Sequence, residues 1–507
     1  MPCLLPKAEW RGVFTLKKMG ALFLSAVISQ TSLAHEDFEL ETRSLEALVS
    51  RLDALRAEVE HNTQTMGAYN ENLLSSLNSL TEALVSVEAW QEAADTLEQQ
   101  IQILRINDGL FTQAQIPLLQ QQLGILAARH DWATLQSRLE YLTYLVERDH
   151  DQIPAETRLA QYKLLTDWTR LLLTRGPRAA EARYVLQLHA IEDAALQLAQ
   201  AELRNPDIVQ DLIYDRSVAE LYIALGIMGN FDTRSQLINR VDGPRPTTVR
   251  RLQTISSITD AESMYGTATS TMIERAHRAA MNQHLNTIAS LATVYGHGED
   301  PKAALASLEQ TDPEQAGIIK LFMGDSVLLR QQYELRLGSH IGLSRGSSNT
   351  GSAARHYQEA WELLLKAGYS NDQLNDWFAC PALLPLHQFS KKLESLSRNC
   401  STDENGNATI QATAVVRNGI PGLRYEQLPD SKLISAAEGV AAEAKFTVGM
   451  NGQADRIEII GANPDVTSTR IRGKQALEAL QFRPVLRDGK TVRTEGVTMT
   501  IYSLSSG

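Results

Sequence analysis

The fold at the end of the chain is decided by the stretch Lys445-Phe-Thr-Val448, Met450-Asn-Gly452 and Ala454-Asp-Arg-Ile-Glu-Ile-Ile460. Apolar and polar residues alternate on both sides of a short turn. Asn-Gly is the strongest short-range signal for a tight hairpin turn, because both residues tolerate the left-handed backbone that such a turn requires. The stretch therefore predicts a β-hairpin.

The residues that follow predict a helix and a second hairpin. Arg470 to Leu480 has apolar residues at helical spacing, and Pro484 ends the helix because proline cannot continue it. Val485-Leu486, a turn at Asp488-Gly489 and a last strand from Val492 to Tyr502 complete the pattern. The last strand has one apolar face, formed by Val497, Met499 and Ile501. The expected order is strand, strand, helix, strand, strand.

This order and its spacings resemble the C-terminal domain of TonB-type energy transducers, over about residues 436–504. The matching residues are Glu438-Gly439, Phe446, Val448, Gly452, Ala476-Leu477, Ala479-Leu480, Phe482, Pro484 and Gly489-Lys490. The chain departs from the family at the Tyr-Pro pair that commonly precedes this block, where Leu433-Ile-Ser-Ala-Ala437 stands instead. The resemblance implies a small α+β domain over residues 436–507.

The resemblance also implies a way of binding, because the TonB domain grips a short segment of outer-membrane receptors as an added strand. A free sheet edge captures an extended peptide through backbone hydrogen bonds. We expect the last strand to be that edge. The candidate partner-binding residues are Arg493, Thr494, Glu495, Gly496, Val497, Thr498, Met499, Thr500 and Ile501. The apolar side chains among them are expected to pack on the helix of residues 470–480, and the binding role concerns the backbone.

The beginning of the chain predicts an export signal. Lys17-Lys18 precede an apolar run from Met19 to Ile28, and the small-residue pattern Ser32-Leu-Ala34 follows. This is typical of a signal peptide over residues 1–34, cleaved between Ala34 and His35. A membrane-spanning helix needs about 20 apolar residues, so a retained anchor is the second interpretation. The first interpretation predicts a periplasmic protein, and the second an inner-membrane protein that faces the periplasm.

Charge and cysteine content agree with export. The formal net charge of −12 argues against nucleic acid or an anionic membrane surface as a partner. Cys3 leaves with the signal, so Cys380 and Cys400 remain. Two cysteines in an oxidising compartment predict one disulfide that closes a short loop, with two buried free thiols as the alternative.

Between its two ends the chain is predicted to be helical. Residues 76–400 are rich in Ala, Leu, Gln and Glu, with apolar residues at three- and four-residue spacing. A helix, a short turn with Trp and a second helix recur after about forty residues. The apolar positions are Leu80, Leu84, Trp90, Ala93, Leu97 and Ile101, and then Leu123, Leu126, Trp132, Leu135 and Leu139. This recurrence predicts a degenerate tetratricopeptide-type solenoid.

The expected fold class is therefore mainly α with a small α+β end domain. An α-solenoid of tetratricopeptide-like helix pairs is followed by the TonB C-terminal-like domain. Residues 35–75 are expected to form an amphipathic helix and a loop ahead of the solenoid. Residues 401–435 are expected to be a linker with one strand, Thr409 to Val416, that extends the sheet of the end domain.

The sequence contains no convincing pattern for catalysis, a cofactor or a metal. Gly324-Asp325-Ser326 is similar to the nucleophile block of one family of serine esterases, but it lies in an apolar helical run, where a helix start or a repeat turn is expected. The histidines form no HExxH or comparable ligand pair. Asp403, Asn405 and Asn407 have the spacing of a calcium loop, but Ala408 stands where that loop needs glycine. We expect no catalytic residue, no cofactor and no metal.

These observations favour a periplasmic, non-enzymatic adaptor or scaffold that binds protein partners, among them segments of outer-membrane receptors or other envelope proteins. The alternative is a TonB-type energy transducer with a retained signal anchor, which serves outer-membrane transport. A hydrolase built on Ser326 is a third hypothesis. An unpaired strand at 493–502 would also allow a homodimer through that edge.

Overall fold

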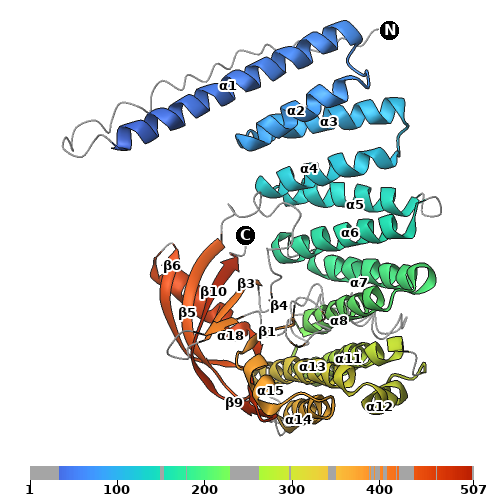
Figure 1. Cartoon of the computed structure of the whole chain (residues 1–507), viewed down its shortest axis with the longest axis vertical. Helices are drawn as coiled ribbons and strands as arrows, with labels where there is room; N and C mark the ends of the chain where they lie inside the picture. Colours follow the sequence, from blue (N-terminus) through green and yellow to red (C-terminus); the bar gives the residue numbers. More distant parts are fainter. Residues whose placement is uncertain are drawn as a thin grey trace. The chain divides into compact units, whose positions relative to one another are not determined.

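The computed structural model shows a mostly helical chain whose strands gather toward its end (Figure 1). It describes residues 33–504 except 149–152, 178–179, 229–261, 296–297, 341–349, 387–388, 390–392, 394–399, 403–407, 418–419, 422–438 and 464. The chain forms two compact units, residues 1–96 and residues 97–507. Within the described residues, no helix combines the length and the apolar character that crossing a membrane requires.

The first unit is built on a long amphipathic helix. Its helices are α1 (Leu33–Met66), α2 (Leu73–Ser86) and the start of α3 (Trp90–Asn107). Leu52 is buried, and Leu55 and Val59 are half-buried, because three- and four-residue spacing puts them on one face of α1. α1 contacts α2. The predicted cleavage site, Ala34 and His35, lies in the first turn of α1, and residues 1–32 of the predicted signal lie outside the described residues.

The second unit contains helices that pack on one another in chain order. They are α4 (Ile116–Ala128), α5 (Trp132–Arg148), α6 (Ala155–Arg175), α7 (Glu181–Leu198), α8 (Pro206–Met228), α11 (Glu262–Ala289), α12 (Pro301–Thr311), α13 (Pro313–His340), α14 (Thr350–Lys366) and α15 (Asn371–Trp377). Figure 1 shows them as successive layers, and contacts join α4 to α5, α5 to α6, α6 to α7, α7 to α8, α8 to α11 and α13 to α14. Apolar residues on the facing sides form one continuous core.

Two helix pairs share the same turn. Glu88 between α2 and α3, and His130 between α4 and α5, have φ angles of 59° and 58°. This left-handed conformation closes a helix end. Trp90 and Trp132 then start the next helices. The matching hydrogen bonds run from Ala89 N to Leu84 O, 2.9 Å, and from Asp131 N to Leu126 O, 3.0 Å. The recurrence that the sequence predicts around the two tryptophans is therefore present in the backbone.

The strands form one mixed sheet and two small ones. They are β1 (Ala382–Leu384), β2 (Cys400–Thr402), β3 (Ala408–Arg417), β4 (Ile420–Pro421), β5 (Gly439–Val448), β6 (Ala454–Asn463), β7 (Gln481–Arg483), β8 (Val485–Arg487), β9 (Lys490–Val492) and β10 (Thr494–Leu504). The main sheet has the order β2-β3-β10-β5-β6, with β4 beside β3. β1 pairs with β7, and β8 pairs with β9.

The first predicted hairpin is confirmed, because β5 and β6 pair antiparallel on either side of Gly452. The predicted helix lies at Thr467–Ala479 as α18. The second predicted hairpin exists only as the short pair β8 and β9. The strand expected from Val492 to Tyr502 is interrupted at Arg493, and β10 pairs instead with β5 in the main sheet.

The prediction that residues 493–501 form an edge strand is wrong. β10 has β5 antiparallel on one side and β3 parallel on the other. Arg493 precedes the strand. The physical reason is that the expected linker supplies β3, which completes the sheet on this side. The expectation that Thr409 to Val416 extends the sheet is confirmed, whereas a second copy of the chain could add to β10 only by replacing β3.

α18 packs on the sheet at close range. The buried cluster beneath it includes Phe446, Leu477, Phe482, Val497, Met499 and Ile501, so the apolar side chains of β10 pack as expected. A Cβ atom at Gly473 of α18 would lie 2.5 Å from the Cβ of Ala442 on β5. This is well inside the optimal separation of two carbon atoms, about 3.5–4.0 Å. The approach of helix and sheet therefore requires glycine at this position.

We expect Gly473→Ala to lower the free energy of unfolding by about 1–3 kcal/mol, because the added methyl group forces α18 away from β5. Urea denaturation of the full chain measures the change. Lys474→Ala is the matched control, since Lys474 is exposed on the same helix turn and its loss creates no contact with the sheet. Equal stability of the two variants would contradict the close packing.

Candidate functional site

The junction between the sheet and the helices contains a buried ion pair. Arg483 lies on β7, and Asp325 lies on α13. The Arg483 Nε donates to the Asp325 Oδ1 at 2.8 Å, and the Arg483 Nη2 makes a second contact with the Asp325 Oδ2. The Tyr357 hydroxyl on α14 donates to the same Oδ1 at 2.8 Å. The side chains of Arg483 and Asp325 are only 3% and 6% exposed.

The electrostatics of this cluster keep Arg483 charged. Burial works to lower the pKa of Arg483, but the Asp325 carboxylate outweighs it and leaves that pKa above its usual value. Burial, and then the negative charge of Asp325, raise the pKa of Tyr357 well above its usual value, so its hydroxyl keeps the proton it donates. Such a cluster is suited to holding two elements together, because a guanidinium group and a carboxylate form two parallel hydrogen bonds with a fixed geometry.

Further contacts surround the ion pair. Asn375 of α15 and Asp488 of the β8–β9 turn bind each other twice, through Asn375 Nδ2 to Asp488 Oδ1 at 3.1 Å and Asp488 N to Asn375 Oδ1 at 2.9 Å. The Leu486 N–H donates to the Phe378 carbonyl at 3.2 Å. β1, which follows the helices in sequence, pairs with β7. The end domain and the helices from residue 97 onward thus form one compact unit.

Arg483→Met should lower the free energy of unfolding by about 3–5 kcal/mol, because it leaves the Asp325 carboxylate buried without its partner. Urea denaturation measures the loss. Arg493→Met is the matched control: its side chain is 42% exposed and its ion pairs with Asp455 and Glu495 span 3.5 and 3.7 Å. Exposed pairs contribute about 0–1 kcal/mol. Similar losses in both variants would show that the buried pair does not hold the junction.

Ser326 forms a hydrogen bond with a histidine, but in the core. The His284 Nδ1 lies 2.7 Å from the Ser217 carbonyl, so this nitrogen carries the proton, and the His284 Nε2 lies 2.9 Å from the Ser326 Oγ. Both side chains are 3% exposed. The neighbouring Asp325 carboxylate is bound to Arg483 and Tyr357 rather than to His284. The arrangement ties α8, α11 and α13 together and leaves the hydroxyl without access from solvent.

The expectation of a helix start or turn at Gly324-Asp325-Ser326 is wrong, because these residues lie in the middle of α13. Gly324 serves close helix packing: a Cβ atom there would lie 2.5 Å from the Tyr357 Cε1. His277 makes the same contact as His284 two turns earlier on α11, with its Nδ1 3.0 Å from the Ala224 carbonyl. These histidines are packing residues.

Acidic pH should destabilise the helical body through His284. Burial lowers the pKa of this imidazole below its usual value, despite its bond to the Ser217 carbonyl and the charge of Glu220. The unfolded chain takes up a proton at a pH near 6.5, before the folded chain does, so this stability is complete above about pH 6.5 and is lost as the pH falls through the folded-state pKa.

We expect the free energy of unfolding of the wild type to fall more steeply below about pH 6.5 than that of His284→Asn, which cannot titrate. Urea unfolding at a series of pH values measures both slopes. The comparison uses slopes only, since the substitution also shifts the baseline stability. Parallel pH profiles would contradict a neutral, buried His284.

A second buried polar cluster joins α6, α7 and α8. The Arg170 Nη2 donates to the Glu192 Oε1 at 2.8 Å and lies 3.3 Å from the Asp215 Oδ1. Burial raises the pKa of Glu192 to about 8 and that of Asp167 to about 6, while the Arg170 charge works to lower both. The sequence offers only one signal for this cluster, which is the presence of single charged residues on apolar helix faces.

Among the described residues, no group of three or more His, Cys, Asp or Glu could hold a metal.

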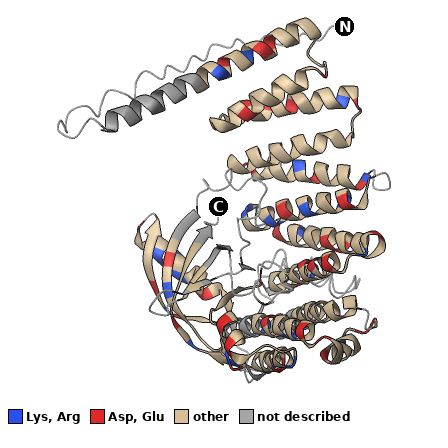
Figure 2. Cartoon of the chain, in the orientation of Figure 1, with Lys and Arg blue, Asp and Glu red and all other residues tan. Residues whose placement is uncertain are grey.

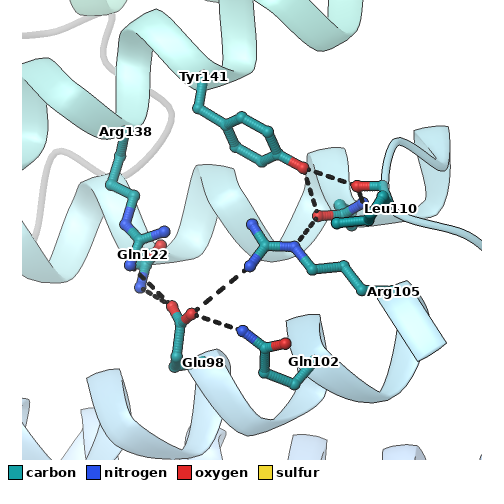
Figure 3. Close-up of polar contacts among 8 residues, drawn as sticks. Glu98, Gln102, Arg105, Leu110, Gln122, Arg138 and Tyr141 are labelled. Atoms are coloured by element: carbon teal, nitrogen blue, oxygen red, sulfur yellow. Dashed lines mark hydrogen bonds and ion pairs between the residues drawn. The ribbon is translucent and has the colours of Figure 1, made fainter.

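A third polar network lies at a more open position between α3, α4 and α5 (Figure 3). The Glu98 carboxylate accepts hydrogen bonds from Arg138 at 2.9 Å and from Gln122 at 3.3 Å. The Arg105 Nη1 lies 3.8 Å from it, and the Arg105 Cζ lies 5.1 Å from the centre of the Tyr141 ring. Figure 2 shows acidic and basic residues interspersed along the helices. This network fixes the spacing of three helices at a polar, partly exposed surface.

Among the described strands, β6 forms one edge of the main sheet, and β2 and β4 lie at the other. β6 pairs with β5, and the register shifts twice along this pair. Arg456 has a left-handed backbone (φ 51°), and Asp455, Arg456 and Glu458 are exposed. Bulges and charges of this kind prevent an edge from adding another strand. The side of β10 that faces away from β5 is covered by β3, and the register of that pair shifts once, between Met499 and Ile501.

The cysteine prediction is confirmed for one partner. Cys380 is disulfide-bonded. Cys400 lies in β2, and its side chain is outside the described ones, so the pairing of the two stays a prediction.

No protein-family model matches this chain, and no curated protein matches it at a significant level. The resemblance to the TonB C-terminal domain therefore depends on the residues quoted above.

Proposed function

We propose that the chain is a non-enzymatic protein-binding scaffold of the cell envelope. In this proposal a tetratricopeptide-type α-solenoid and a TonB C-terminal-like sheet act as one body. The observation that carries it is the buried Arg483–Asp325 pair, which joins β7 of the end domain to α13. A scaffold needs its binding surfaces at a constant spacing, because surfaces that are already positioned lose less freedom when a partner binds.

The sheet is the part that takes an extended segment. β3 lies parallel to β10 and is hydrogen-bonded to it, so the backbone of β10 is able to accept an added strand on this side. Strand addition of this kind draws its affinity from main-chain hydrogen bonds and its specificity from alternate side chains. The irregular, charged edge of β6 is less suited to this role.

The helices supply the second surface. Stacked helix pairs present a long face on which partners bind. The network around Glu98, with Arg105, Arg138 and Tyr141, holds polar side chains in fixed positions on α3 and α5. Fixed polar groups recognise a partner with little loss of side-chain entropy. A periplasmic location is part of the proposal and is supported by the export pattern of residues 1–34.

Strand addition makes a prediction that can be tested with peptides. Random peptides displayed on phage are panned against the immobilised full chain, and the affinity of a selected peptide is measured by fluorescence anisotropy. N-methylation of its backbone amides, one at a time, should weaken binding at every second position, because each blocked hydrogen bond contributes about 0.5–1.5 kcal/mol. Amides at the intervening positions point away from the sheet and should tolerate the methyl group.

A scrambled peptide of the same composition is the control. Tolerance of N-methylation at every position, or failure of panning to enrich any peptide, would overturn the proposal of strand capture.

A further inference from the structure

The pairing of β3 with β10 differs from the other pairings in the main sheet. It is the only parallel pair among the described strands there, whereas the pairs β2–β3, β3–β4, β5–β10 and β5–β6 are antiparallel. Parallel ladders are slightly less stable per residue, because their hydrogen bonds are slanted. β3 also comes from the segment ahead of the end domain, so β10 has a neighbour that lies outside the strand-strand-helix-strand-strand unit.

The pairing of β3 with β10 is interrupted. Thr409 and Ile410 pair with Thr498 and Met499, and pairing resumes at Ala414 opposite Ile501. The three residues of β3 between Ile410 and Ala414 thus face one residue of β10. On the side away from β10, β2 and β4 pair only with the two ends of β3, and no described strand pairs with residues 411–415 there. The pairing of β5 with β10 is regular from Val497 to Leu504.

The described start of β3 contributes two side chains to the end-domain core. Its Ala408 and Ile410 side chains are buried in the end-domain cluster, and Thr409 between them is exposed. β5 places Ala444, Phe446 and Val448 in the same cluster. At residues 408–410, displacing β3 would remove one small and one medium-sized side chain from this cluster. The rest of the cluster is held together by β5, β10 and α18.

We propose that β3 is an exchangeable strap: it covers the strand-addition edge of β10 in the free protein and is replaced there by a partner segment. This inference rests on the proposed function. The strap also indicates what the partner looks like. The segment should be uncharged, run parallel to β10, and carry a small residue and an aliphatic residue two positions apart, as Ala408 and Ile410 do. A hydroxyl residue between them would keep the bond that Thr409 Oγ1 makes with Thr498 Oγ1 at 2.9 Å.

The strap itself supplies the probe for a test. A fluorescein-labelled peptide with the sequence of residues 406–418 is titrated into the full chain and followed by anisotropy. Ile410→Ala removes the larger buried side chain of the strap, so it should bind the peptide at least tenfold more tightly than the wild type. Glu443→Gln, an exposed change on β5, is the control and should bind like the wild type.

A locked variant tests the place of binding. The 2.9 Å between the hydroxyl oxygens of Thr409 and Thr498 puts cysteines at both positions within reach of a disulfide. The oxidised Thr409→Cys, Thr498→Cys variant should not bind the peptide, and reduction should restore binding. Equal binding to the oxidised and reduced forms would overturn the inference, as would the absence of peptide binding to Ile410→Ala.

Amide hydrogen exchange of the wild type tests the exchangeable strap without any substitution. The amides of β3 should exchange at least tenfold faster than those of β5, and equal protection of the two strands would contradict an exchangeable strap. The outcomes also separate the two proposals. A strap that exchanges while panning enriches no peptide supports the strap and overturns strand capture of a partner. Selected peptides that bind the oxidised variant as tightly as the wild type would support capture of a partner segment and overturn the exchangeable strap.

Discussion

A buried ion pair between Arg483 and Asp325 joins the end domain to the helices at the centre of their other contacts. Moving each ion out of water costs several kcal/mol, so the pair is tolerated because its geometry is bidentate and the Tyr357 hydroxyl satisfies the carboxylate further. Guanidinium and carboxylate bind each other at fixed distances and angles, so a shift at this junction leaves a charge unpaired. The ion pair therefore selects one arrangement of β7 on α13.

β7 connects the ion pair to the rest of the end domain. Arg483 follows Phe482, whose side chain is fully buried in the end-domain core, and the Phe482 N–H donates to the Gly452 carbonyl at 2.8 Å. The Gln481 Nε2 donates to the Asn451 carbonyl at 2.6 Å. Three successive residues thus connect the helices, the core and the β5–β6 turn. A displacement of α13 would reach the main sheet through this short strand.

Local signals in the sequence predict much of the fold, and the errors concern partners that are distant in sequence. The Asn-Gly turn and the alternation around Met499 predict β5, β6 and β10 correctly, whereas Pro484 is expected to end the helix, which ends at Ala479 and is followed by the unexpected strand β7. No spacing rule brings β3 next to β10, because alternation predicts a strand without naming its neighbour. The same holds for the candidate site: Asp325 and Arg483 are separated by 158 positions, and His284 and Ser326 by 42. The sequence contains one signal for these residues, which is a polar side chain within a run of apolar ones.

The central place of β10 sets the order in which the end domain is assembled. A ribosome makes β3 and β5 before β10, so for a time these two strands exist without the strand that lies between them. Each then exposes an unpaired backbone edge, and the apolar face that Val497, Met499 and Ile501 complete is still open. If the two strands paired with each other first, they would have to separate again. A chaperone that holds this segment open would therefore act before β10 pairs with the two strands.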